Sequence, residues 1–183
     1  MGLFYSQIRD QCDYVRRATE ELEPALAAQD TDRVWYCLQN LLSAAANISK
    51  ALWGVNPEIE KAREPLRASL GITDDSPLRS RELRNHFDHF DERLDEWDKK
   101  STTRIYMDRN ILPSGMNLIG GIGTGKHDEL RRYFPDTAIA TFFGDAYELV
   151  PIVQAAVDLL PIAAKKAREP HPDPPDNTSG TGQ

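Results

Sequence analysis

The chain has 183 residues, of which 40% are hydrophobic, and it carries a formal net charge of −7. This length and composition predict one domain with a sizeable core, over residues 1–168. The acidic balance disfavours a broad, sequence-independent nucleic-acid binder, because such proteins present a basic face. The first residues mix charged and apolar side chains without a long apolar run, which indicates no signal peptide and a cytoplasmic protein.

Two long helices are expected at the start of the chain. Apolar side chains recur at helical spacing over residues 3–28, with Pro24 as a kink or a break. Asp30 or Thr31 can cap a second helix, and Gly54 can end it. The apolar stripe of this second helix consists of Val34, Leu38, Leu41, Ala45, Ile48 and Leu52.

The two cysteines of the chain, Cys12 and Cys37, fall on these two expected helices. In an antiparallel pair that turns near Asp30, they would lie about 16 Å apart along the axis. That separation exceeds the reach of a disulfide, so both are expected to be reduced and buried.

A shorter helix is expected from about Glu58 to Leu70, where Gly71 can supply a left-handed ending. Ser76 and Pro77 then predict the start of a further helix, since proline suits the first helical position. We expect this helix to reach Lys100 and to bury one face along its whole length. The residues of that face are Leu83, Phe87, Phe90, Leu94 and Trp97.

The hydrophobic period changes after Lys100. The runs "RIYMD" and "TAIATFF" are rich in β-branched and aromatic residues and flank the glycine-rich "SGMNLIGGIGTGK". They predict a small β-hairpin inserted at about 103–143, before the last helix. The fold class expected from the whole pattern is therefore all-α, an up-and-down bundle of four to five helices.

The last helix is expected from about Asp145 to Lys166. Charged residues and prolines interrupt its apolar run, which argues against a membrane span. Its expected buried side consists of Leu149, Val153, Ala156, Val157 and Leu160. Residues 169–183 are polar and proline-rich, and we expect them to be a disordered tail.

The segment "GGIGTGKH" approaches a phosphate-binding loop, with Gly120, Gly125 and Lys126 at the required spacing. His127, however, stands where a serine or threonine hydroxyl would hold magnesium. Such a loop also needs a buried strand before it and a helix after it, and neither is expected here. The glycine-rich loop at 120–125 is better interpreted as a connector.

The most informative stretch is "LRNHFDHFDERLDEW", residues 83–97. A guanidinium such as that of Arg84 can hold a phosphate, and a histidine such as His89 can move a proton near neutral pH. Counting about 100° per residue, both lie off the apolar stripe, with Asn85 on the outward face and His86 closer to the core. Arg84 and His89 are therefore the candidate catalytic residues for metal-independent RNA cleavage.

On one helix Arg84 and His89 point about 140° apart, so a single copy encloses a phosphate poorly. Two copies that meet across a twofold axis would bring both pairs into one cleft. The chemistry therefore predicts a homodimer.

The Arg-x4-His spacing in "RNHFDH", with the polar Asn85, resembles the signature of the HEPN superfamily, helical bundles found in prokaryotic toxins and defence proteins. The resemblance implies a dimeric ribonuclease toxin with Arg84 and His89 as catalytic residues and Asn85 in support, an RNA substrate and an antitoxin partner. It implies no cofactor. HEPN toxins controlled by a nucleotidyltransferase antitoxin carry a tyrosine two residues after the histidine, whereas Asp91 stands at that position here.

Three other interpretations of the same stretch remain open. It could be a catalytically inactive HEPN-like module for dimerisation or binding, or a solvated helix face whose charges are ordinary i, i+4 neighbours. Glu82, His86 and His89 could also share one side of the helix as metal ligands. No second group of ligands stands out elsewhere, so no metal is predicted.

Overall fold

The computed structural model describes residues 1–79, 90–102, 104–116 and 128–170. In this part of the chain there are six α-helices, a short 3₁₀ helix and four strands. The helices are α1 (Gly2–Ala27), α2 (Thr31–Trp53), α3 (Pro57–Ala62), α4 (Glu64–Leu70), η1 (Pro77–Arg79), α6 (Phe90–Lys100) and α7 (Leu149–Arg168). The strands are β1 (Asn110–Ile111), β2 (Arg131–Phe134), β3 (Ile139–Phe142) and β4 (Asp145–Glu148).

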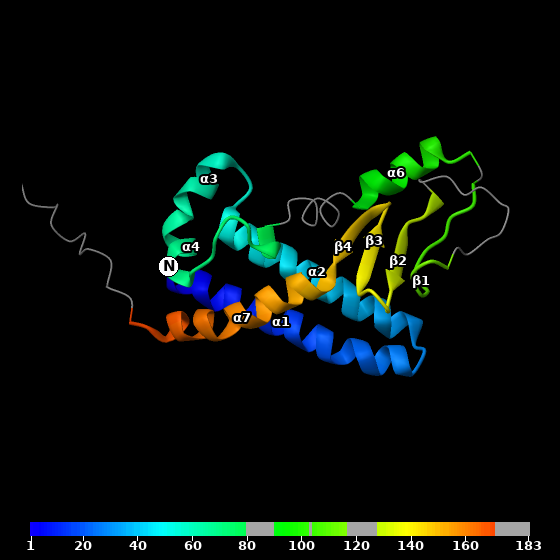
Figure 1. Cartoon of the computed structure of the whole chain (residues 1–183). Helices are drawn as coiled ribbons and strands as arrows, with labels where there is room; N and C mark the ends of the chain where they lie inside the picture. Colours follow the sequence, from blue (N-terminus) through cyan, green and yellow to red (C-terminus); the bar gives the residue numbers. More distant parts are fainter. Residues whose placement is uncertain (80–89, 103, 117–127, 171–183) are drawn as a thin grey trace, which may run out of the picture.

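The two expected long helices are confirmed as α1 and α2, an antiparallel pair (Figure 1). Asp30 caps α2 by accepting a hydrogen bond from the Arg33 backbone N–H at 3.0 Å. Gly54 ends α2 at a φ of 66°, and an added Cβ would lie 2.2 Å from the Ile59 Cγ2 atom, so glycine is required there. Pro24 lies inside α1 and does not end it. All six residues of the predicted α2 stripe are buried.

The helix expected at 58–70 is divided into α3 and α4, which meet at Arg63. Gly71 ends α4 in the left-handed conformation, as expected. The buried Arg67 side chain holds the pair to α2, because its Nη1 donates to the Leu52 carbonyl at 2.8 Å and to the Glu60 carbonyl at 2.9 Å. One guanidinium therefore satisfies carbonyls near the ends of α2 and α3.

The predicted all-α class with a small hairpin is wrong, because the structure combines its helices with a four-stranded mixed sheet in the order β1-β2-β3-β4. β1 is parallel to β2, whereas β2–β3 and β3–β4 are antiparallel. The prediction failed because the strands are only two to four residues long, which leaves little periodic signal in the sequence. "TAIATFF" does contain β3, but "RIYMD" forms only an isolated bridge, between Met107 and Glu129.

One face of the sheet packs on α2 through aromatic rings. Trp35 of α2 contacts Phe142 edge-on, at 6.1 Å between centroids, and Phe142 contacts Tyr147 in the same way at 6.1 Å. Tyr133 and Ala140 share this face, and both belong to the main hydrophobic core. Figure 1 shows the sheet over the amino-terminal half of α2, whereas α3 and α4 lie towards its other end.

The last helix differs from the prediction in its start and in its buried face. Residues 145–148 form β4, so α7 begins at Leu149, and the expected boundaries of the β insertion were too narrow. The buried face predicted for this helix was only partly right, since Val153 and Leu160 are half-buried. The buried residues of α7 are Leu149, Ile152, Ala156, Leu159 and Ala163, because α7 packs mainly along α1.

Of the helix expected from Pro77 to Lys100, the structure describes its two ends, the 3₁₀ turn η1 at the start and α6 at the end. The expected burial along its whole length is wrong, since Leu94 is 38% exposed. Cys12 and Cys37 are both buried and free, as expected. Over the described ranges, no helix combines the length and the apolar character that crossing a membrane requires.

Candidate functional site

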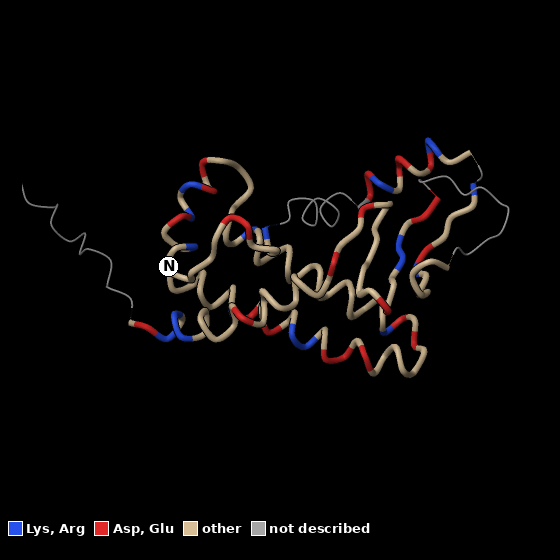
Figure 2. Tube along the Cα trace, viewed as in Figure 1, with Lys and Arg blue, Asp and Glu red and all other residues tan. Residues whose placement is uncertain are grey.

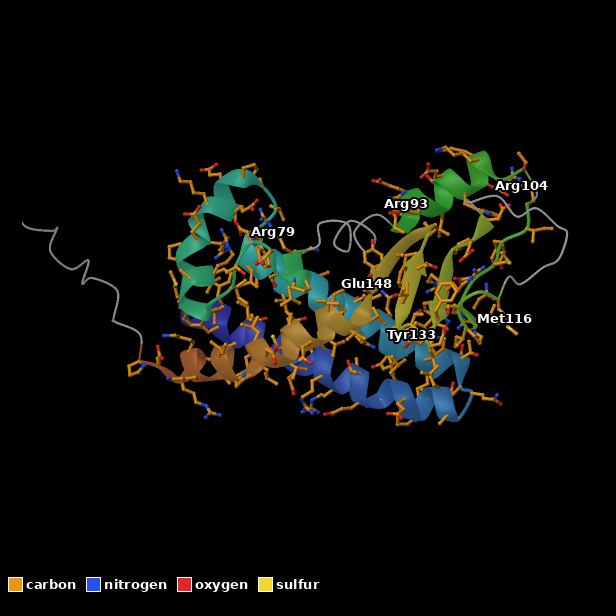
Figure 3. All side chains as sticks on the ribbon, viewed as in Figure 1. Arg79, Arg93, Arg104, Met116, Tyr133 and Glu148 are labelled. Atoms are coloured by element: carbon orange, nitrogen blue, oxygen red, sulfur yellow. The ribbon has the colours of Figure 1, made fainter. Side chains whose placement is uncertain are left out.

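The three predicted catalytic residues, Arg84, Asn85 and His89, lie outside the residues that the structure describes. The same holds for the glycine-rich loop at 120–125 and for His127. What the structure provides is the geometry of the chain on both sides of the Arg84–His89 motif. Figure 3 shows Arg79 and Arg93 on the two sides of the motif. Arg79 is the last residue of η1 and the last described residue before the motif, and Arg93 lies on α6, which follows the motif.

The chain that leads into the motif is held firmly to the helices. Leu78 of η1 is 2% exposed and packs against α2 and α7. The Arg79 guanidinium donates to a Glu60 carboxylate oxygen at 2.6 Å and to the Asp74 carbonyl at 3.2 Å. The Trp53 indole N–H donates to Asp74, and this hydrogen bond lowers the pKa of that carboxyl. The entry to the motif is therefore fixed by both burial and charge.

The chain that leaves the motif is α6, and its contacts are weaker. Trp97 packs edge-on against Tyr106, at 5.7 Å between ring centroids. Leu94 and the exposed Asp91 find no comparable cover in the described part of the chain.

The surface of α6 is dominated by charge, and Figure 2 shows acidic and basic residues alternating along it. The five acids and three bases of this helix leave a net charge of 3 − 5 = −2. Arg93 contacts Glu96 at 3.5 Å, and Lys100 pairs with the same carboxylate. An acidic helix directly after the motif disfavours the approach of a phosphate backbone on that side.

A buried aspartate ties the end of α6 to the start of the sheet. The Ser101 hydroxyl donates to Asp128 Oδ1 at 2.7 Å, and Asp128 is 2% exposed. The Asp128 carbonyl also accepts from the Met107 N–H at 2.7 Å. The first strand described after the glycine-rich segment is β2, which begins at Arg131.

Sequence reasoning missed the arginines of β2. Arg131 makes a two-pronged contact with Asp108, at 2.7 and 2.6 Å, and its guanidinium lies 5.6 Å from the Trp35 ring centre. Arg132, on the other face, pairs with Glu129 at 2.8 Å. The one available signal was the alternation of side chains between the two faces of a strand in "RRYF". Two adjacent arginines hid this alternation, because both are charged.

Among the described residues, no group of three or more histidine, cysteine, aspartate or glutamate side chains could hold a metal ion. The proposed ligands Glu82, His86 and His89 lie outside those residues. Comparisons with protein-family models, with curated proteins and with solved structures found no match.

Proposed function

We propose that this chain is a HEPN-like, metal-independent endoribonuclease of a toxin–antitoxin or phage-defence system, which acts in the cytoplasm as a homodimer. The observation that carries the proposal is the arrangement Arg84-Asn85-x3-His89 in the sequence. These residue types, at this spacing, supply a phosphate ligand and a proton carrier without a metal ion.

In the proposed reaction Arg84 binds the scissile phosphate and offsets the charge that grows on it. His89 takes the proton of the ribose 2′-hydroxyl while the 2′-oxygen attacks phosphorus. The bond to the 5′-oxygen breaks, and that oxygen receives a proton from a second His89, that of the other copy. The products are a 2′,3′-cyclic phosphate and a free 5′-hydroxyl.

The flanks of the motif support this proposal. Arg79, with its contacts to Glu60 and Asp74, holds the chain before it, and the hydrogen bond from Ser101 to Asp128 holds the end of α6 after it. A site needs its reactive groups held in place by surrounding packing and hydrogen bonds. Anchors on both sides of residues 80–89 are what such a site requires.

The alternative is a catalytically inactive module that binds a partner. The acidic surface of α6 favours it, because the helix adjoins the motif and carries the net charge of −2. The half-exposed Leu94 and Trp97 on the same helix would suit contact with a protein.

An RNA-cleavage assay with EDTA present tests the proposal. The parent protein should cleave, and His89→Ala should lower the rate by about 100-fold or more, as expected for loss of a proton carrier. Arg84→Ala should have a similar effect. Arg93→Ala is the matched control, because it removes a nearby arginine that, within the described residues, pairs with Glu96 on the surface of α6.

Product ends and oligomeric state complete the test. Cyclic phosphate ends that disappear in His89→Ala, together with a dimer in sedimentation, would establish the nuclease. A folded dimer that cleaves none of several RNA classes would refute it and favour the binding module. Since Asp91 replaces the tyrosine, we expect an antitoxin partner to act by direct binding and not by tyrosine modification.

A further inference from the structure

An open, mostly apolar groove of about 300 Å³ lies between α1 and α7, beside the turn that joins β2 to β3. Leu22 and Leu26 of α1 form one wall, and Leu149 and Val153 of α7 form the other. Val150, at the groove, is 63% exposed, although it is an aliphatic residue. A groove of this size and lining is at the lower end of the range for small-molecule sites.

Most polar side chains of the groove are already engaged or point to solvent. The Thr19 hydroxyl donates to the Val15 carbonyl of its own helix at 2.9 Å. The Gln154 amide donates to Asp158 at 2.9 Å. Glu23 is exposed to solvent. None of these three groups needs a ligand to satisfy it.

Tyr133 is the exception. Its side chain lines the groove and is only 3% exposed, yet its hydroxyl makes no hydrogen bond with the described part of the chain. The Tyr133 hydroxyl oxygen is also not among the fully buried polar atoms of the described residues. Figure 3 places Tyr133 where β2 meets the long helices. Burial raises the pKa of Tyr133, so the phenol is neutral and able to donate a hydrogen bond.

We propose that this groove binds a neutral small molecule that has an apolar body and one oxygen that accepts a hydrogen bond from Tyr133. Leucine and valine side chains would cover the body, and the phenol would orient the oxygen. The ligand is neutral because Glu23 is the one charged side chain among the described residues of the lining and would repel an anion. The site lies apart from the proposed nuclease residues and does not depend on their activity.

Binding can be measured on the full chain with N-phenyl-1-naphthylamine, a neutral probe whose fluorescence rises in apolar surroundings. The probe should bind saturably, and two competitors of the same shape should then displace it, 2-acetylnaphthalene and 2-ethylnaphthalene. The ketone should bind about three- to tenfold more tightly, which is the effect of one hydrogen bond. Tyr133→Phe should abolish this preference and leave the folded state intact, because the lost hydroxyl has no hydrogen-bond partner among the described residues.

Two further variants test whether the ligand binds in this groove. Val150→Trp should fill the groove and weaken probe binding at least fivefold, whereas Ile162→Trp, on the same helix and 41% exposed, should not. Any of three results would overturn the proposal: no saturable binding, a ketone preference that survives Tyr133→Phe, or tighter binding of 2-naphthoate than of the ketone. Self-association that Val150→Trp abolishes would assign the groove to a second copy of the chain instead.

Discussion

In the helical part formed by α1, α2 and α7, the core consists mainly of aliphatic side chains, and Ile8, Leu38 and Leu42 are fully enclosed. In the sheet with α6, the strands are short and charged pairs join them to their neighbours, as Arg131 with Asp108 and Arg132 with Glu129. Apolar burial therefore dominates the first part, whereas the second adds directed charged contacts to the aromatic face that packs on α2. The proposed catalytic residues lie in the sequence between these two parts.

The comparison is tested most severely in the helical core. Leu38→Ala should lower the free energy of unfolding by about 2–5 kcal/mol, because it removes a fully buried side chain and leaves a cavity. Urea unfolding followed by circular dichroism measures this. Leu3→Ala is the control, since Leu3 is 74% exposed and its loss should matter little. Equal effects of the two changes would refute the assigned core.

The next largest effect is expected in the sheet. Asp108→Asn should cost about 1.5–3 kcal/mol, because it weakens two charge-assisted hydrogen bonds to a guanidinium that is 21% exposed. Asp98→Asn removes an exposed partner of Arg104 in the same region and should change stability by less than about 0.5 kcal/mol. Comparable losses for both would show that burial does not distinguish these pairs.

In the helical core, the buried Cys12 should make the free energy of unfolding depend on pH. Burial raises the pKa of Cys12 from 9.0 to about 12, so the folded state keeps a proton that the unfolded state releases. Its contribution is complete below pH 9 and is lost as the pH rises towards 12. At pH 10 the loss should be about 1.4 kcal/mol relative to pH 8. Urea midpoints of the parent should fall more than those of Cys12→Ala, and parallel curves would contradict the prediction.

The smallest effect is local to one helix end. Asp30→Ala should cost about 1 kcal/mol, because it removes the acceptor that caps α2. Asp30→Asn keeps an acceptor oxygen and should be close to the parent. Thermal unfolding of the three proteins would measure the series, and a loss in the asparagine variant as large as in the alanine variant would disprove a capping role.

The accuracy of the sequence predictions follows the same division between the two parts. The stripe of α2 and its ends at Asp30 and Gly54 were read correctly, because each depends on neighbours within four residues. The strand β4 was taken for the start of the last helix, since its apolar residues continue into those of α7. β1 is two residues long and pairs with β2 across a segment of 19 residues, 112–130, so nothing local marks it.

For the candidate sites, the proposal of Arg84, Asn85 and His89 rests on the sequence alone, because it depends on residue type and spacing. The sequence could not identify Tyr133 as a binding residue. That assignment needs the burial of the ring and the absence of a partner for its hydroxyl within the described structure. The position of Asp128 beside Ser101 likewise joins residues 27 positions apart.

The sequence by itself determined the two long helices and the two ends of α2, since helix periodicity and capping act over a few residues of chain. The tertiary structure alone decided the mixed sheet, the buried face of α7 and the groove around Tyr133. These depend on which distant surfaces pack together, and packing free energy is a property of the pair of surfaces and not of either segment.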